Sequence, residues 1–135
     1  MTSKLNRIPF LPALFFASLA ALGCASTTEK EHEGARSVEI KVVEYKFTPN
    51  TITAHSEEPL DIELDNEGKF EHSIEFDVPG AKPALEQPVP PGKTAHLAIV
   101  APREPGTYTF FSPVGDDRTK GLTGKLLVTS LPSKH

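Results

Sequence analysis

The segment PGTYTFFSPVGDDRTKGLTGKLLV, residues 105–128, places a polar loop between two apolar stretches. The stretches GTYTFFS (106–112) and GKLLVTS (124–130) combine small or polar residues with aromatic or aliphatic ones, and each begins with a glycine. This pattern predicts two β-strands. The loop between the strands contains no cysteine, histidine or methionine. It therefore offers neither sulfur nor imidazole to a metal ion.

Five upstream segments have the same character and lack the 3.6-residue periodicity of a helix. In residues 59–66, for example, Leu60, Ile62 and Leu64 alternate with polar residues. The 13 prolines, most of them at segment edges, further disfavour helices. We expect about seven strands in an antiparallel β-sandwich. The five segments are VEIKVVEYKF (38–47), NTITA (50–54), PLDIELDN (59–66), EHSIEFD (71–77) and KTAHLAIV (93–100).

The N-terminus has the features of a secretory signal. Lys4 and Arg7 precede an apolar run, residues 8–22, that is too short and proline-rich for a comfortable membrane span. The run ends in AALGC, which resembles the lipobox of bacterial lipoproteins and implies lipidation at Cys24. The alternative is an ordinary cleaved signal with an incidental cysteine. Ala25 stands where aspartate would imply inner-membrane retention, so the resemblance favours an anchor in the outer membrane, facing the periplasm.

We therefore expect four regions. Residues 1–24 form a lipoprotein signal peptide, 25–37 a polar tether, 38–131 the folded domain and 132–135 a tail. The domain then has no thiol, which excludes a disulfide, a catalytic cysteine and a thiolate metal ligand.

The charge of the chain bears on its partners. Both basic residues before Cys24 are lost on processing, which leaves 12 basic and 18 acidic residues and a net charge of about −6. Such a balance argues against nucleic acid as a partner, because phosphates need neutralising cations. It permits a metal ion, or an envelope protein with a basic face.

Four motifs in order resemble the cupredoxins. They are YKFTPNTITA (45–54), DNEGKFEHSIEF (65–76), PPGKTA (90–95) and the segment 105–128. The chain resembles the branch called EfeO-type cupredoxin-like domains, small periplasmic domains tied to iron or copper handling. This resemblance implies a Greek-key β-sandwich and a metal site at one end of it.

Each of the four blue-copper ligands of that family can be matched by resemblance to a residue of this sequence. The first histidine falls on His72, the cysteine on Ser112, the second histidine on Asp117 and the methionine on Leu122. Serine is a poor substitute for thiolate, and leucine cannot ligate. We therefore expect no blue-copper centre.

A harder metal site remains an alternative. If the sandwich closes as in the family, His72, Ser112 and the loop carrying Asp116 and Asp117 converge. One imidazole and one or two carboxylates can hold Cu(II), Fe or Zn with water. In the other interpretation, His72 is half-buried and hydrogen-bonded to Ser112 or Asp117, as a structural relic of a metal site.

The other histidine and acidic residues are weaker candidates for metal ligands. His32 is expected in the tether, His55 at a strand end, His96 facing solvent and His135 in the tail. Acidic residues are suspected iron ligands in the EfeO-type branch, and the stretches that correspond contain Glu75 and Glu86.

The sequence favours a binding protein over an enzyme, because it has no nucleophile elbow, phosphate loop or paired-carboxylate motif. The leading hypothesis is a lipid-anchored, periplasm-facing cupredoxin-like protein accessory to copper or iron handling, with a non-blue metal site or none. The alternatives are a metal-free interaction domain and an electron-transferring copper protein.

Overall fold

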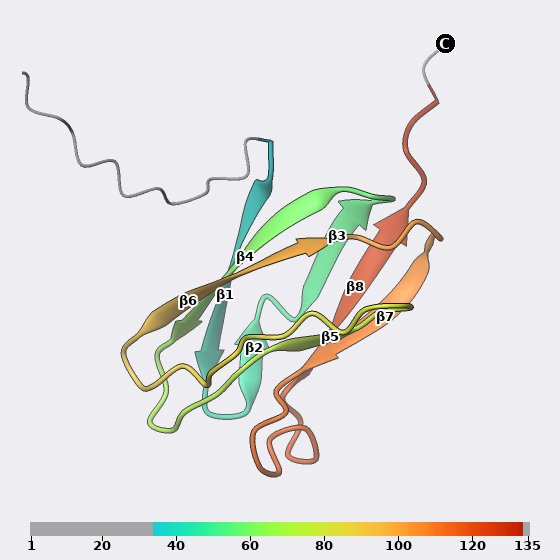
Figure 1. Ribbon diagram of the computed structural model, residues 1–135. Helices are drawn as coiled ribbons and strands as arrows, with labels where there is room; N and C mark the ends of the chain where they lie inside the picture. Colours follow the sequence, from blue (N-terminus) through green and yellow to red (C-terminus); the bar gives the residue numbers. More distant parts are fainter. Residues whose placement is uncertain (1–33, 134–135) are drawn as a thin grey trace, which may run out of the picture.

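The computed structural model describes residues 34–133, which form eight β-strands and no helix (Figure 1). One four-stranded sheet has the order β2-β1-β4-β6 and the other the order β3-β8-β7-β5. The prediction of an all-β sandwich is confirmed. The strands are β1 (Arg36–Val43), β2 (Lys46–Thr48), β3 (Thr51–His55), β4 (Pro59–Asn66), β5 (Glu75–Asp77), β6 (Thr94–Val100), β7 (Gly106–Phe111) and β8 (Thr123–Thr129).

Two of the predicted strands are interrupted. The segment expected as one strand over 38–47 turns at Glu44, whose positive φ of 52° reverses the chain and separates β1 from β2. The segment expected as a strand over 71–77 is regular only from Glu75, while His72 makes an isolated bridge with Val89. The first interruption raises the number of strands from about seven to eight.

The prediction that the strands are all antiparallel is wrong. β1 pairs with β4 in parallel, and so does β3 with β8. Only β1–β2 and β7–β8 are neighbours both in the chain and in a sheet; at every other connection the chain crosses to the opposite sheet. Such crossings allow parallel pairing, which a two-residue hairpin does not.

The core lies between the sheets and centres on Phe110, which is fully buried. Its ring centroid is 5.3 Å from that of Phe47 and 5.2 Å from that of Phe76. Gly124 makes room for this ring, because a Cβ there would stand 2.1 Å from a carbon of Phe110. Other buried core residues are Ile40, Val42, Ile52, Leu60, Ile62, Leu64, Ile74, Leu122, Leu126 and Val128.

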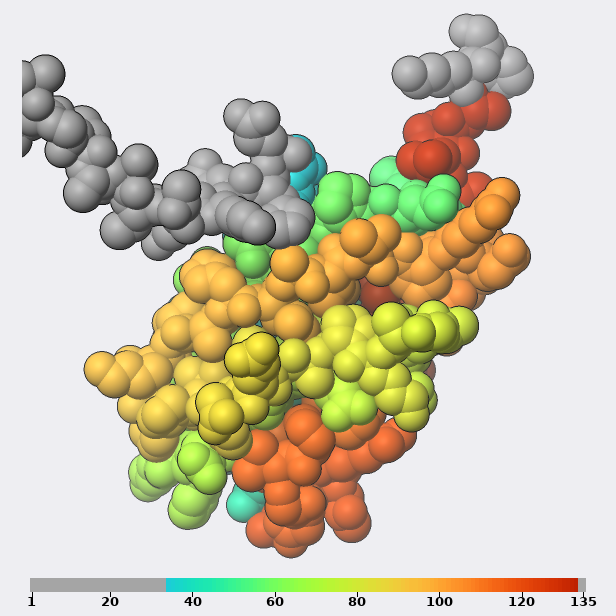
Figure 2. Space-filling model, viewed as in Figure 1, coloured from blue at the N-terminus to red at the C-terminus, as the bar shows by residue number. Residues whose placement is uncertain are grey.

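The two ends of the sandwich differ in what they carry. The start of β1 and the C-terminal end of β8 lie at one end, and the loop 112–122 between β7 and β8 lies at the other (Figure 1). The connection from β5 to β6, coloured yellow-green, crosses the face shown in Figure 2. In residues 34–133 no helix is long and apolar enough to cross a membrane. The predicted signal peptide, Cys24 and most of the tether lie outside the described residues.

Arg36 fixes the start of β1 to both sheets. Its Nε donates to Glu58 at 2.7 Å, and its Nη2 donates to the carbonyl of Thr53 at 2.7 Å. The hydrogen bond from Arg36, followed by one from the backbone N–H of His55, lowers the pKa of Glu58 below its ordinary value. The ionised form of Glu58 is therefore favoured by folding.

We expect this pair to make stability depend on pH. A lowered carboxyl pKa contributes stability that is present above the unfolded pKa, about 4.3 for Glu, and is lost as the pH falls through the folded value. Glu58→Gln should therefore lower the melting temperature at neutral pH, and the difference from wild type should shrink as the pH falls below the unfolded pKa and through the folded one. Glu57→Gln, at the neighbouring exposed site, is the matched control and should leave the profile unchanged. Equal melting temperatures for Glu58→Gln and wild type at neutral pH would contradict this account.

Candidate functional site

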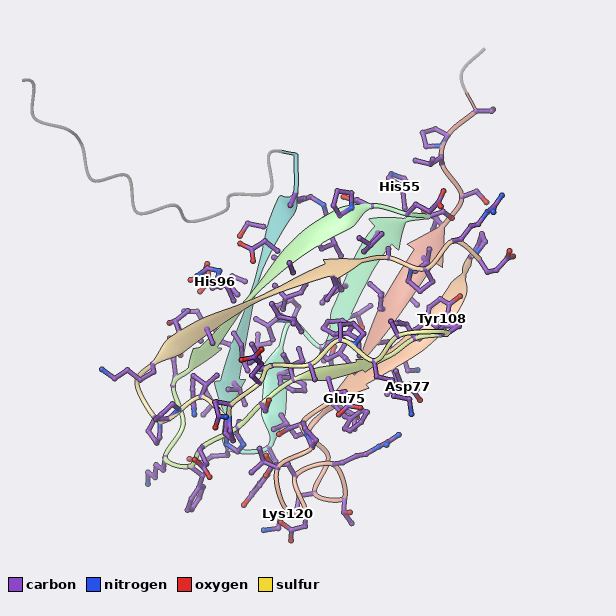
Figure 3. The ribbon with its side chains drawn as sticks, viewed as in Figure 1. His55, Glu75, Asp77, His96, Tyr108 and Lys120 are labelled. Carbon is purple, nitrogen blue, oxygen red and sulfur yellow. The ribbon has the colours of Figure 1, made fainter. Side chains whose placement is uncertain are left out.

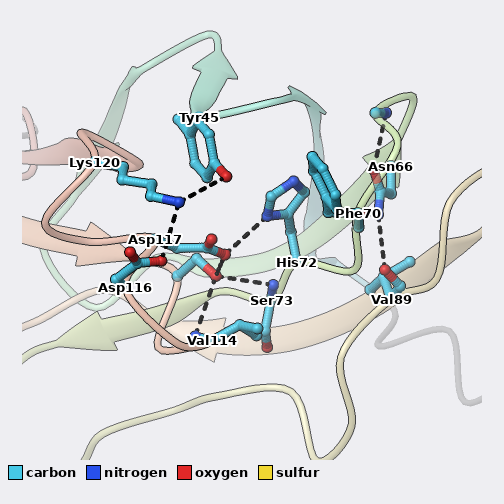
Figure 4. A network of polar contacts seen from close by, with 12 residues as sticks. Tyr45, Asn66, Phe70, His72, Ser73, Val89, Val114, Asp116, Asp117 and Lys120 are labelled. Atoms are coloured by element: carbon cyan, nitrogen blue, oxygen red, sulfur yellow. Dashed lines mark hydrogen bonds and ion pairs between the residues drawn. The ribbon is translucent and has the colours of Figure 1, made fainter.

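Three polar side chains meet in the interior beside the loop 112–122. His72 Nδ1 lies 2.8 Å from Asp117 Oδ2, and Ser112 Oγ donates to the same oxygen at 2.7 Å (Figure 4). His72 and Ser112 are fully buried, and only 6% of Asp117 is exposed. A carboxylate can only accept hydrogen bonds, so the Nδ1 of His72 carries a proton. One carboxylate oxygen therefore joins the segment before β5 to the loop after β7.

Ser112 is also an acceptor at the centre of this network. Its Oγ accepts from the backbone N–H of Ser73 at 3.1 Å and from that of Val114 at 3.4 Å. Regular alternation along the segment 71–77 would place Ser73 on the outer face, opposite His72, but only 3% of Ser73 is exposed. The alternation of a regular strand does not apply here, because β5 begins only at Glu75.

The second ring nitrogen of His72 has no partner. Its Nε2 is buried and makes no hydrogen bond. The ring of Tyr45 packs edge-on against the imidazole, with centroids 6.1 Å apart and the planes at 78°. Because Nδ1 holds the proton, a neutral His72 presents an unused lone pair at Nε2. An unpaired buried acceptor costs free energy, so this atom is an exception that needs an explanation.

Asp116 lies outside this network. Its side chain is 67% exposed and pairs with Lys120 at 3.4 Å. Lys120 also donates to the hydroxyl of Tyr45 at 3.1 Å and lies 4.7 Å from the centre of its ring. The Tyr45 hydroxyl, followed by Asp116, raises the pKa of Lys120. Of the four predicted site residues, the structure thus joins His72, Ser112 and Asp117 and leaves Asp116 on the surface.

Asn66 organises the neighbouring loop, a role that the sequence analysis did not assign. Its Nδ2 donates to the carbonyls of Phe70 at 2.7 Å and Val89 at 2.8 Å, and its Oδ1 accepts from the N–H of Gly68 at 2.9 Å. The residue is fully buried. The signal available in the sequence was the Asn-x-Gly spacing, in which an asparagine bonds a backbone two residues on. Figure 4 shows this second set of hydrogen bonds beside His72.

The other candidates are dispersed (Figure 3). His96 is exposed, as expected, with its Nδ1 3.3 Å from Asp61, and His55 Nδ1 lies 3.2 Å from the hydroxyl of Thr129. Glu75 is half-buried on β5, and Glu86 is exposed on the β5–β6 connection. Among residues 34–133 no three histidine, cysteine or acidic side chains are grouped to hold a metal ion. His32 and His135 lie outside the described residues.

The three buried residues do not have the arrangement of a hydrolase triad. In a triad the serine hydroxyl bonds to the imidazole, which removes its proton. Here Ser112 donates to Asp117, and His72 bonds to the same carboxylate oxygen from its Nδ1. Ser112 is also fully buried, out of reach of a substrate.

Comparison with known proteins agrees with the β-sandwich fold. The sequence model of one protein family, the cupredoxin-like domain, matches residues 14–128. The chain belongs to the cupredoxin-like domain family. Comparison with curated protein sequences gave no match.

Solved structures show the same fold at low sequence identity. Auracyanin B is 16% identical over 71% of this chain and 90% of its own, with a TM-score of 0.63. Auracyanin from the photosynthetic bacterium Roseiflexus castenholzii is also 16% identical, over 71% of this chain and 98% of its own, with a TM-score of 0.62. A multicopper oxidase is 21% identical over 71% of this chain and 42% of its own, with a TM-score of 0.56. Cupredoxin-like domains thus occur within an enzyme as well as on their own.

The residues at the four positions that the resemblance to cupredoxins assigns as ligands do not suit a blue-copper ion. Ser112 supplies a hydroxyl in place of a thiolate, and it already donates its proton to Asp117. Leu122 is fully buried and has no ligating atom. The position of the second histidine holds Asp117, which is itself hydrogen-bonded. His72 is the one imidazole in the set.

We expect the two neighbouring aspartates to differ sharply in their effect on stability. Asp117→Ala removes the acceptor of two buried donors, and each buried polar group left without a partner costs about 1–3 kcal/mol of unfolding free energy. Asp116→Ala removes an exposed carboxylate and should leave that free energy nearly unchanged. Urea unfolding of both variants measures the difference. Equal losses would mean that the buried network adds nothing to stability.

Proposed function

We propose that this chain is a non-enzymatic, lipid-anchored binding protein of the bacterial envelope. In this proposal its cupredoxin-like domain recognises a protein partner and carries no blue-copper centre. One observation carries the proposal: the carboxylate of Asp117, at a family ligand position, accepts hydrogen bonds from both His72 and Ser112. The side chains that would have to hold a metal are already bonded to one another.

A metal ion bound by Asp117 would have to displace these hydrogen bonds. Each buried polar group left without a partner costs about 1–3 kcal/mol. Movement of Ser112 would also affect the backbone N–H groups of Ser73 and Val114, which donate to it. The hydrogen bonds therefore favour a metal-free interaction domain over metal handling, which reverses the order expected from the sequence.

The second candidate function is copper or iron handling, and the unpartnered Nε2 of His72 favours it. Metal-binding histidines commonly donate their other N–H to a carboxylate, which fixes the ring and increases its basicity. His72 and Asp117 have this relation. In this alternative Asp117 orients the imidazole through its hydrogen bond to Nδ1, and the metal ligand is Nε2 of His72, not the carboxylate of Asp117. Tyr45 would have to move to admit the ion, because Nε2 is buried.

The third alternative, electron transfer, has the least support. Auracyanin A, from a green thermophilic photosynthetic bacterium, is described as a "blue" copper protein and shares the fold at 16% identity and a TM-score of 0.60. Identity this low carries over the fold alone. Ser112 and Leu122 replace the two sulfur ligands that tune such a centre.

The anchor bears on where a partner would bind. The described chain begins at the end of the sandwich opposite the loop 112–122 (Figure 1). Ten residues of tether span at most about 36 Å. A chain held at Cys24 by a tether of this reach would allow that far end, with Lys120 and the exposed Phe70, to face away from the lipid. This orientation supports a partner in the periplasm.

Metal titration separates the two leading candidates. We expect no binding of Cu(II), Fe(III) or Zn(II) by calorimetry, with the fold monitored by circular dichroism. Micromolar binding, about −8 kcal/mol, would support metal handling if it is lost in His72→Ala and kept in His96→Ala, which removes an exposed imidazole. Intense visible absorption with Cu(II) would contradict both and restore the blue-copper alternative.

The anchor is tested by Cys24→Ser expressed with the native signal segment. If Cys24 is lipidated, the variant should move from the membrane fraction to the soluble fraction or remain as an unprocessed precursor, distinguished by its mass. Wild type should incorporate labelled fatty acid, and the variant should not. Membrane association of mature, unlabelled protein in both would contradict the lipid anchor.

A further inference from the structure

A polar groove lies on the sheet β3-β8-β7-β5, and its lining includes none of His72, Ser112 and Asp117. Its volume is about 390 Å³, within the range of small-molecule sites, roughly 300–1,000 Å³. Thr51 and Thr109 are the register partners of Lys125 on its two neighbouring strands, so the three lie side by side across the sheet. The lining residues are Asn50, Thr51, Thr109, Arg118, Thr123, Gly124 and Lys125.

The lining of the groove is positively charged, whereas the chain as a whole has a negative net charge. The protein has 18 acidic and 14 basic residues, yet the groove is lined by Arg118 and Lys125 and by no carboxylate. Neither cation forms an ion pair within the described residues. Asp77, the register partner of Thr109 on the far side, stands on the edge strand β5 and does not line the groove (Figure 3).

The lining presents hydrogen-bond donors that the protein leaves unused. The guanidinium carbon of Arg118 lies 4.0 Å from the centre of the Phe111 ring, which holds the cation over the sheet while its N–H groups remain available. The hydroxyls of Thr109 and Thr123 have no partner in residues 34–133. Lys125 adds three more N–H donors.

We propose that this groove binds the phosphate group of a small phosphorylated compound. Two cations and several hydroxyl donors suit a tetrahedral dianion, whose oxygens accept more hydrogen bonds than a carboxylate can. The volume leaves room for an organic group attached to the phosphate. A free phosphate ester and a phospholipid headgroup share this chemistry, and the experiment distinguishes them.

Calorimetry on the purified chain, at low salt, tests the site with glycerol 3-phosphate, inorganic phosphate and uncharged glycerol. We expect millimolar or tighter binding of the first two and none of glycerol. Arg118→Gln combined with Lys125→Gln should weaken binding at least about tenfold. Lys93→Gln, an exposed lysine before β6 in the other sheet, should not weaken it. Asp77→Asn should strengthen it, because a neighbouring negative charge is removed.

Flotation with phosphatidylglycerol vesicles identifies the source of the phosphate. Vesicle binding that Arg118→Gln with Lys125→Gln abolishes supports the site and assigns it to a lipid headgroup. Binding of glycerol 3-phosphate without such vesicle binding supports the site and assigns it to a soluble ester. Absence of both, or equal weakening by Lys93→Gln, overturns the proposal. Because metal ions play no part in this test, its failure leaves the role of His72 open.

Discussion

The carboxylate of Asp117 holds together the end of the sandwich at the loop 112–122. It accepts hydrogen bonds from His72, in the segment before β5, and from Ser112, at the end of β7. These groups are buried, so each would be costly without its partner. The loop 112–122 and the segment 71–74 therefore keep their places because one oxygen satisfies two donors.

The packing of the hydrophobic core also holds the loop 112–122 in place. Phe110 packs between Phe47 and Phe76, and Gly124 on β8 leaves space for its ring. Phe110 and Phe111 precede Ser112 directly, so the packing of β7 determines where the hydroxyl stands. Leu122, at the other end of the loop, is fully buried in the same core. Apolar packing at both ends of the loop thus brings Asp117 towards His72.

The chain has the fold of the cupredoxin-like family, and the residues at the four positions that the resemblance assigns as ligands do not suit blue copper. Hydroxyl, carboxylate and imidazole satisfy one another at the ligand positions. The exception is Nε2 of His72, which has no partner. This atom keeps metal handling as an alternative to the metal-free interaction domain. The groove with Arg118 and Lys125 shares no residue with this network, and its two cations suit an anion, whereas the network would suit a metal cation.

The sequence by itself determined the all-β class, the segments that became most of the strands and the absence of sulfur ligands, because alternation and residue chemistry are local properties. It also brought His72, Ser112 and Asp117 together through the resemblance to cupredoxins. It did not predict the turn at Glu44, the parallel pairs or the burial of Ser73. These depend on which strands meet across the two sheets, and no short segment contains that information. Only the tertiary structure decided that Asp117 bonds inward while its neighbour Asp116 faces solvent. The backbone conformation of the folded loop determines which of two consecutive side chains points into the interior, and two adjacent aspartates look alike in the sequence.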